Sequence, residues 1–539
     1  MSSIAFKLPS SIEVGLSTSK KNNAYYPGEP VSVAVNVFNA LGKDASSKVT
    51  WKITDFERKT VKNGDFDLNL KKDESQSKII KIDLPKGFFT FSANLDAKEN
   101  HVKKEAQASI AVISPFSNKK QSGNNFFGGH FWRGTPNFVF ALAEEIGQKY
   151  SYIFHLLSWA GSPQNWKENN PQWKIADEKL AVAKKHNMTP IMSLYGCPPW
   201  TGGKEQPQDP AKINDKLISG WSDYTSEIAK RYKDRVKYWV VWAEFMRAPF
   251  DVTAQNYLKF VKGAYEAIKK QNPEAVVVGY GIHEFKDTLL KAEAAFKAGT
   301  LDYVDVVGIN PYWRPHSPEE MGYGKMLDKL KGLMRKYNNG KEKPLWVTEI
   351  GWRGSDTLYS ELPYGEGKTY TDFVTELAQA ENIVRMHIIS LAKGVKLFNT
   401  FCVYAGAYPS IFNYSLVHQG DFTPKLGYVA YNNMVNMLKG LKFDKEIRKG
   451  KGIRCYQFKD ESNGEQVFTI WSCGKKTAKI ALALKPGKVE ITNMVGKALQ
   501  PAKSGKNILA LTGSPLYLRG KGGELEKSIQ KSEISYDKN

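Results

Sequence analysis

The pattern of apolar and polar residues divides the chain into three regions. In residues 1–115, short runs such as 31–38, 49–53 and 89–95 alternate apolar and polar side chains between turn clusters. Short strands of this kind, without a helical period, are typical of a β-sandwich. We therefore predict an N-terminal β-sandwich of immunoglobulin-like type, followed by a polar linker at residues 114–124.

In residues 116–440, apolar runs that resemble buried strands alternate with longer amphipathic stretches. Helical spacing of apolar side chains occurs in residues 177–186, 218–232 and 254–271. Eight strand-like runs lie at residues 126–131, 152–157, 190–195, 237–242, 275–280, 304–310, 344–349 and 395–401. This alternation predicts a (β/α)8 TIM barrel. A doubly wound sheet is disfavoured because no glycine-rich dinucleotide loop follows the first run.

After residue 440 the strand-like texture returns. Short runs at residues 454–458, 466–471, 478–484, 488–492 and 515–518 predict a second β-sandwich over residues 441–525. Residues 526–539 are charged and poor in apolar side chains, so we expect a flexible tail. The predicted fold class is therefore multidomain α/β plus β, a TIM barrel flanked by two β-sandwich domains.

Composition limits the possible partners. Hydrophobic residues make up 41% and charged residues 24%, as in folded globular proteins. No run of 18 apolar residues is present, so we expect no membrane partner. The formal net charge of +22 favours polyanions. We expect no nucleic-acid partner because no nucleic-acid-binding motif occurs. An anionic substrate and a charge without functional meaning both remain open.

The cysteines and histidines suggest no redox or metal chemistry. Four cysteines in 539 residues give no disulfide framework, and whether Cys455 and Cys473 pair stays open. No CxxC or HExxH motif occurs, so we expect neither a metal nor an organic cofactor.

Two glutamates carry the candidate chemistry. Glu244 ends the fourth predicted barrel strand, and Glu349 ends the seventh. The carboxyl ends of barrel strands form the face on which TIM-barrel enzymes act. A pair of carboxyl groups is what glycosidic bond cleavage needs, about 5–5.5 Å apart in retaining enzymes and about 6.5–9.5 Å apart in inverting ones. We predict that these two glutamates flank one sugar.

Several local motifs agree with a known pattern. These are Pro198-Pro-Trp200, Asn310-Pro-Tyr312, Thr348-Glu-Ile-Gly-Trp352 and the segments at residues 423–431 and 513–518. Together with the two glutamates, they resemble the glycoside hydrolases of clan A. The similarity is to family 39, which includes β-xylosidases and α-L-iduronidases. The resemblance implies that Glu349 is the nucleophile, that Glu244 is the acid/base and that the anomeric configuration is retained. It also implies that Tyr312 hydrogen-bonds the nucleophile.

The sequence departs from that pattern beside Glu244. Members of the clan usually have asparagine before this glutamate, where it contacts the sugar 2-hydroxyl, and this chain has Ala243. Three explanations are open. The substrate carries a bulky or charged group at that carbon, another side chain such as His283 or Glu284 supplies the contact, or the protein binds sugar without cleaving it. His155 is our candidate to replace an arginine that the clan often places near the nucleophile.

Aromatic and basic residues follow many of the predicted strands. Flat rings pack on sugar faces, and guanidinium groups pair with sulfate or carboxylate. We therefore expect the substrate contacts to come from a set of strand-end residues. These are His130, Trp132, Arg133, His155, Trp159, Trp200, Arg247, His283, Asn310, Tyr312, Trp313, Arg314, Trp352 and Arg353.

We expect a retaining glycoside hydrolase that acts on a polysaccharide or oligosaccharide. An anionic glycan fits the charge, such as a sulfated galactan of the carrageenan type or a uronate-containing glycan. The alternatives are a hydrolase of neutral xylan- or galactan-type chains and an inactive carbohydrate-binding relative. We expect a secreted or periplasmic location, although residues 1–7 contain no apolar signal core. The sequence leaves the oligomeric state open.

Overall fold

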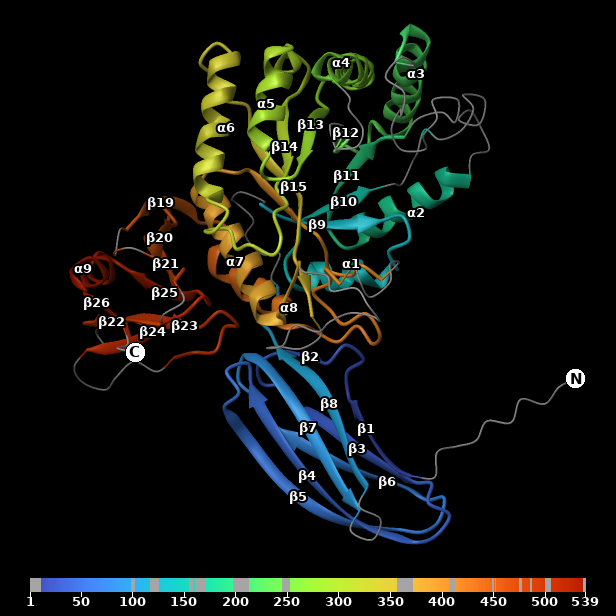
Figure 1. The fold of residues 1–539 in the computed structure, drawn as a ribbon, viewed down its shortest axis with the longest axis vertical. Helices are drawn as coiled ribbons and strands as arrows, with labels where there is room; N and C mark the ends of the chain where they lie inside the picture. The colour runs from blue at the N-terminus through green and yellow to red at the C-terminus, as the bar shows by residue number, and fades with distance from the viewer. Residues whose placement is uncertain are drawn as a thin grey trace, which may run out of the picture.

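The fold combines two β-sandwich regions with a closed barrel (Figure 1). The computed structural model describes residues 11–97, 102–116, 126–154, 159, 171–196, 213–244, 253–355, 372–406, 413–447, 450, 452–474, 477–484, 487–499 and 506–536.

The N-terminal region is a sandwich of two sheets. One sheet contains β1 (Ile12–Thr18), β3 (Val31–Asn39) and β6 (Ser75–Ile82). The other contains β2 (Ala24–Tyr25), β8 (Val102–Val112), β7 (Gly87–Ala97), β4 (Ala45–Asp55) and β5 (Thr60–Leu70). Buried residues alternate along the whole of β3. Val35 from one sheet and Phe91 from the other belong to one core, which confirms the predicted sandwich.

Eight parallel strands close the central barrel. In chain order they are β9 (Phe127–Trp132), β10 (Tyr150–Phe154), β11 (Thr189–Leu194), β12 (Tyr238–Val241), β13 (Val276–His283), β14 (Val306–Asn310), β15 (Leu345–Ile350) and β18 (Leu397–Thr400). The last strand pairs with the first, Phe398 facing Phe127. The TIM barrel predicted from the apolar runs is confirmed.

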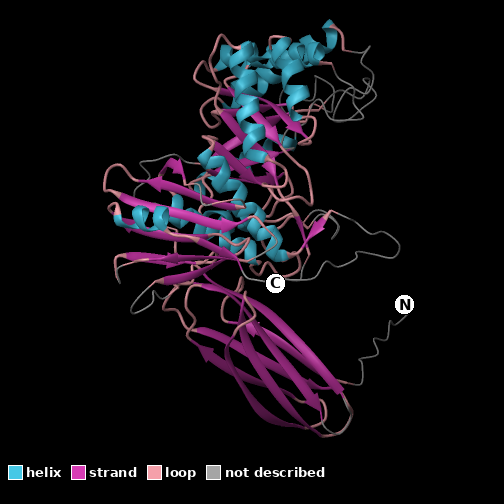
Figure 2. Cartoon of the chain, turned by 60° about the vertical axis from the view of Figure 1, so that its left-hand side comes forward, coloured by secondary structure: helices cyan, strands magenta, loops and turns pink. Residues whose placement is uncertain are grey.

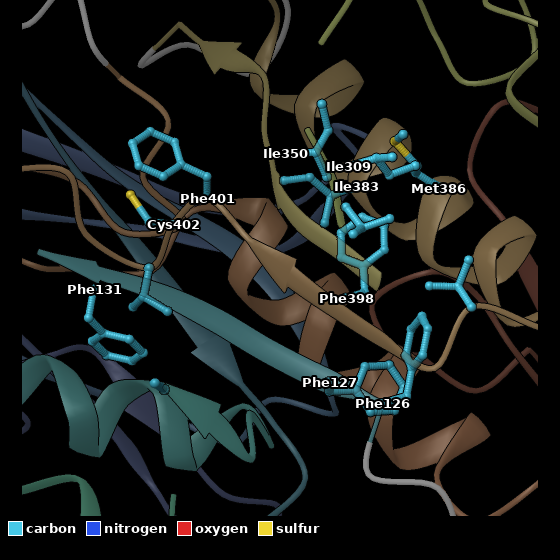
Figure 3. Packing of buried hydrophobic residues seen from close by; sticks show 14 of the residues in the cluster. Phe126, Phe127, Phe131, Ile309, Ile350, Ile383, Met386, Phe398, Phe401 and Cys402 are labelled. Carbon is cyan, nitrogen blue, oxygen red and sulfur yellow. The ribbon is translucent and has the colours of Figure 1, made fainter. Parts of the chain in front are cut away.

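Helices surround the barrel (Figure 2). They are α1 (Phe138–Glu145), α2 (Pro171–Lys185), α3 (Asp215–Tyr232), α4 (Ala254–Gln271), α5 (Thr288–Lys297), the 3-10 helix at Thr300–Tyr303, α6 (Tyr323–Tyr337), α7 (Glu376–Ala392) and α8 (Leu426–Leu438). Figure 3 shows residues of the core between strands and helices, such as Phe398 of β18 and Ile383 of α7. In the described part of the chain, no helix is long and apolar enough to cross a bilayer.

The C-terminal region consists of two further sheets. One contains β19 (Lys442–Glu446), β20 (Ile453–Lys459), β21 (Glu465–Ser472), β25 (Leu516–Lys521) and β23 (Val489–Thr492). The other contains β24 (Asn507–Leu511), β22 (Ala478–Leu482) and β26 (Ile534–Tyr536). Cys455 and Cys473 are not joined by a disulfide.

The prediction of a flexible tail over residues 526–539 is wrong for most of this segment. The chain forms α9 (Glu524–Lys531) and then β26, which pairs antiparallel with β22. Leu525 and Ile529 lie four residues apart on one helix face, and both are buried. Two well-placed apolar side chains therefore hold a helix that its composition did not suggest. Residues 537–539 lie outside the described part.

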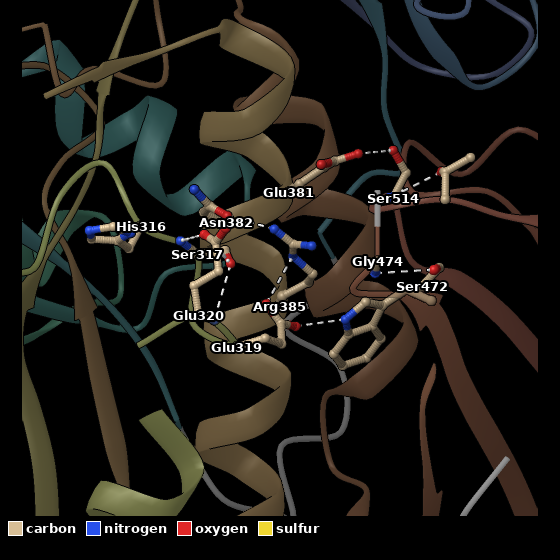
Figure 4. Close-up of polar contacts among 12 residues, drawn as sticks. His316, Ser317, Glu319, Glu320, Glu381, Asn382, Arg385, Ser472, Gly474 and Ser514 are labelled. Carbon is tan, nitrogen blue, oxygen red and sulfur yellow. Dashed lines mark hydrogen bonds and ion pairs between the residues drawn. The ribbon is translucent and has the colours of Figure 1, made fainter. Parts of the chain in front are cut away.

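A polar network joins the barrel to the C-terminal sheets (Figure 4). The indole nitrogen of Trp471 donates to Glu319 at 2.7 Å, and the hydroxyl of Ser514 donates to Glu381 at 2.7 Å. Arg385 of α7 lies between the two carboxylates, with its Nε 3.8 Å from Glu319. Burial raises the pKa of Glu381, and this effect outweighs the opposing charge of Arg385.

We predict that Glu381→Gln stabilises the protein at neutral pH and not in acid. A raised pKa means that the ionised carboxyl costs folding free energy above that pKa, and the cost disappears as pH falls below the unfolded value. Glutamine keeps the acceptor for Ser514 without the charge. Scanning calorimetry at pH 7 should show a higher unfolding temperature, by about 2–4 °C if the gain is about 1 kcal/mol. The exposed Glu461→Gln is the control, and an equal gain at pH 4 would contradict the prediction.

Candidate active site

Glu244 leaves β12 through a turn that enters the left-handed region twice. Trp242 has a φ of 47° and Glu244 a φ of 62°, values that are uncommon for residues other than glycine. The amide of Glu244 donates to the carbonyl oxygen of Gly281 at 3.0 Å. A Cβ on Gly281 would lie 2.9 Å from the Cα of Ala243, so only glycine allows this approach. The ends of β12 and β13 thus hold Glu244 in place.

Glu349 lies on β15 with a hydroxyl donor at one carboxylate oxygen and a histidine ring beside the other. The hydroxyl of Tyr312 donates to Oε1 at 2.9 Å, as predicted from the resemblance. Nε2 of His130, whose side chain is completely buried on β9, lies 3.0 Å from Oε2. Only 15% of the Glu349 side chain is exposed. This carboxyl group is therefore contacted by residues from β9 and from just after β14.

The surroundings of Glu349 favour its ionised form. Burial by itself raises the pKa of this carboxyl group. The nearby His130 ring acts against burial, as do the Tyr312 hydroxyl and the His283 ring. These effects outweigh burial, and the pKa of Glu349 lies below its usual value. A carboxylate that stays ionised in a buried site is suited to act as a nucleophile.

Glu244 is held by a polar chain from β14 and β15. The side-chain amide of Asn310 donates to Oε1 of Glu244 at 3.0 Å. The hydroxyl of Thr348 in turn lies 2.6 Å from the amide oxygen of Asn310. Asn310 and Thr348 are both buried. The segment Asn310-Pro-Tyr312 therefore donates to both candidate carboxyl groups from one strand end.

The two carboxylates affect the same neighbours. Burial raises the pKa of Tyr152 and of Tyr312, and the charges of Glu349 and Glu244 raise both further. Nε2 of His283 lies 4.0 Å from Oε1 of Glu244, and its charge also acts on Glu349. The glutamates from β12 and β15 thus meet at one end of the barrel.

Two of the predicted arginines, Arg314 and Arg353, share the same two partners, Asp372 and Tyr414. Asp372 accepts from Arg353 at 3.0 Å and lies 3.0 Å from Arg314. The hydroxyl of Tyr414 accepts from both arginines. Pairing of β16 (Arg353–Gly354) with β17 (Phe373–Val374) brings Asp372 to Arg353. The cluster of two guanidinium groups and one carboxylate keeps one net positive charge, and its Arg314 lies over the Tyr312 ring at 5.4 Å.

Some predicted sugar contacts are wrong because the side chains are buried. Trp159 is 1% exposed and stacks on Tyr224, and Trp352 is 1% exposed and donates to the carbonyl oxygen of His316. Neither ring has a face open to a sugar. His130 and Asn310 are also buried, and each contacts a glutamate instead.

Other predicted contacts remain accessible. Trp132 and Trp313 are half-buried, and Trp313 stacks on Phe285. Arg133 is exposed. The predictions for His155, Trp200 and Arg247 fall outside the described residues.

The structure adds residues that the sequence did not single out. The charges of both carboxylates act on Tyr152. Asp372 offsets part of the charge of the arginine cluster, and the hydroxyl of Tyr414 accepts hydrogen bonds from it. Asp372 stands at no predicted strand end, so no local pattern marked it. The structure also places Ala243 in the cluster of apolar residues inside the barrel, and His283 beside Glu244. The half-exposed Glu284 lies farther out, with Oε1 3.8 Å from His283.

Comparisons with known proteins support the fold. No protein-family model matches the sequence, and no curated protein sequence matches it. Among solved structures, a family 39 glycoside hydrolase from Bacteroides cellulosilyticus WH2 aligns with a TM-score of 0.70 at 19% identity, over 94% of this chain and 100% of that one.

Two family 30 xylanases also align. Xyn30A from Clostridium acetobutylicum gives a TM-score of 0.51 at 11% identity, over 75% of this chain and 97% of that one. The catalytic domain of xylanase C from Talaromyces cellulolyticus gives 0.50 at 11% identity, over 76% of this chain and 99% of that one. The resemblance inferred from the sequence motifs is thus confirmed at the level of structure. This protein has the fold of the clan A glycoside hydrolases.

Proposed function

We propose that the protein is a retaining glycoside hydrolase with Glu349 as nucleophile and Glu244 as acid/base. The proposal rests on one observation: the two carboxyl groups at one mouth of the barrel have different hydrogen-bonding and charged neighbours. Glu349 is kept ionised by Tyr312 and His130, whereas Glu244 accepts from the neutral amide of Asn310. Paired carboxyl groups in unequal surroundings are what acid and nucleophile roles require.

In the proposed reaction, the ionised Glu349 attacks the anomeric carbon while Glu244 gives its proton to the departing glycosidic oxygen. The bond from carbon to the leaving oxygen breaks as the glycosyl ester to Glu349 forms. Glu244, now ionised, then takes a proton from water, which displaces Glu349 and regenerates both groups. Two inversions at one carbon give retention. The residues that hold the carboxyl groups, Tyr312 and Asn310, come from a single strand end.

We further propose that the substrate is an anionic glycan. The cluster of Arg314, Arg353 and Asp372 carries one net positive charge beside Tyr312, and the whole chain carries +22. A sulfate or carboxylate on the sugar would pair with the guanidinium groups. His283 beside Glu244 supports the explanation in which another side chain replaces the contact missing at Ala243. A secreted or periplasmic location, as expected from the sequence, remains part of this proposal.

A carbohydrate-binding protein without activity is the rival, because Ala243 puts no polar group at the position beside Glu244. Turnover of aryl glycosides separates the two. An enzyme should release phenol, and NMR of the first product should show retention. A binder should release none from any glycoside in the panel while still showing affinity in calorimetric titrations.

The roles of the two glutamates predict different losses. Glu349→Ala should abolish catalysis, so that the aryl glycoside is hydrolysed only at the uncatalysed rate measured in buffer. Glu244→Ala should lose about 10²–10⁴-fold on substrates with poor leaving groups, the usual contribution of general acid catalysis. Added azide should restore the rate of Glu244→Ala by occupying the space of the lost carboxyl and attacking the glycosyl ester. The surface variant Glu342→Gln is the control. Equal loss in all three variants would rule out the assigned roles.

The hydrogen bond from Tyr312 predicts a shift in the pH dependence. Because this bond stabilises the ionised form of Glu349, Tyr312→Phe should raise the pKa of that carboxyl. Loss of activity on acidification should then begin at a higher pH. The measurement is the acidic limb of kcat/KM for an aryl glycoside. Tyr323→Phe is the control. It removes a buried hydroxyl that hydrogen-bonds Ser390 rather than Glu349, and it should leave the acidic limb of kcat/KM unchanged. An unmoved limb in Tyr312→Phe would contradict the nucleophile assignment.

The arginine cluster predicts dependence on substrate charge. Arg314→Gln should raise KM for a sulfated or uronate-containing glycan by about tenfold, the order expected for one hydrogen bond to a charged group. It should leave KM for the matching neutral glycan nearly unchanged. Added salt should raise KM for the charged glycan more in the wild type than in the variant, because salt screens the ion pair that the variant lacks. Arg335→Gln on α6 is the control, and equal effects on both glycans would contradict an anionic subsite.

A further inference from the structure

A buried hydrogen-bonded chain connects the strand of one candidate carboxyl to the other carboxyl. Thr348 immediately precedes Glu349 on β15, and its side chain is completely buried. Its hydroxyl lies 2.6 Å from Oδ1 of Asn310 and 3.2 Å from the carbonyl oxygen of Ile309. Nδ2 of Asn310 then donates to Oε1 of Glu244 at 3.0 Å.

The chemistry of each group orients this chain. A threonine hydroxyl has one proton, and the amide oxygen of Asn310 is its nearest acceptor. With its oxygen toward Thr348, Asn310 presents the NH₂ group to Glu244. An amide NH₂ only donates, so Oε1 of Glu244 must accept whether the carboxyl is ionised or protonated. The acidic proton is thereby confined to the other oxygen, Oε2.

We propose that Thr348, acting through Asn310, is a positioning residue that keeps the acidic proton of Glu244 on Oε2. The inference rests on the proposed function, in which Glu244 protonates the leaving oxygen. A proton on a fixed oxygen meets the leaving group in one geometry, whereas a carboxyl that rotates presents its proton in only part of its orientations. The strand that holds the nucleophile thus also orients the acid.

The arrangement is reciprocal across β14 and β15. Tyr312, two residues after Asn310, donates to Glu349, while Thr348, one residue before Glu349, supports the donor to Glu244. A change at Thr348 is therefore expected to act on proton donation without removing a donor from Glu349. This separation makes the inference testable.

Thr348→Val is the informative variant because valine has nearly the shape of threonine without the hydroxyl. The measurement is kcat/KM for aryl glycosides whose phenols span a wide range of acidity. 2,4-Dinitrophenolate leaves without a proton, and 4-methoxyphenolate needs one. Thr348→Val should lose about tenfold more on the 4-methoxyphenyl than on the 2,4-dinitrophenyl glycoside. Thr348→Ser, which keeps the hydroxyl, should restore the wild-type ratio between the two substrates.

Asn310→Ala provides a second variant if Thr348→Val does not fold, as judged by circular dichroism. It should show the same preference for the good leaving group, with a larger loss. An equal loss on both glycosides, or Thr348→Ser resembling Thr348→Val, would overturn the inference.

Glu244→Ala distinguishes failure of the inference from failure of the proposed function. If Glu244→Ala spares the dinitrophenyl glycoside and Thr348→Val does not, only the positioning role is wrong. If Glu244→Ala loses equally on both glycosides, Glu244 is not the acid, and the positioning role falls with the assigned function.

Discussion

Closure of eight parallel strands into one barrel is the constraint on which the site depends. Glu244 and Glu349 are far apart in the chain, and each strand bears only one of them. Because β9 pairs with β18 as well as β10, all strand ends must face one mouth. An open sheet of the same strands would leave His130 on β9 and Tyr312 after β14 far apart, and Glu349 would lose one of these two contacts.

The cost of burying a carboxylate explains how the mouth is organised. An ionised Glu349 in a mostly buried position is unfavourable unless donors and positive charge compensate it. His130 on β9, His283 on β13 and Tyr312 after β14 compensate it, and the same strand end that gives Tyr312 to Glu349 gives Asn310 to Glu244. Because Gly281 has no side chain, β13 comes close enough for the carbonyl oxygen of Gly281 to accept a hydrogen bond from the Glu244 amide. Polar residues that maintain the carboxyl groups thus occupy positions that a sequence pattern suggests for substrate contacts.

Much of this fold can be predicted from the sequence, because burial of one face of a helix or strand imposes a regular spacing of apolar residues. The helix predicted at residues 254–271 coincides with α4, since apolar spacing and an N-cap at Thr253 agree there. The two glutamates were found because strand ends are marked by a polar residue after an apolar run. Trp159 and Trp352 were misjudged for the converse reason: a tryptophan after a strand packs inward as readily as outward. Asp372 and α9 depend on contacts between distant segments, which no local pattern records.

The arginine cluster shows why net charge alone is a poor guide to substrate. Arg314 lies over the ring of Tyr312 and forms a cluster with Arg353, yet Asp372 cancels half of the charge of the two arginines. The remaining charge is nevertheless well placed, because both guanidinium groups are fixed by Tyr414 and little exposed. A single fixed charge of low exposure acts through less solvent than many mobile surface lysines, which salt screens readily. The proposed selectivity for an anionic sugar therefore rests on this one cluster rather than on the +22 of the whole chain.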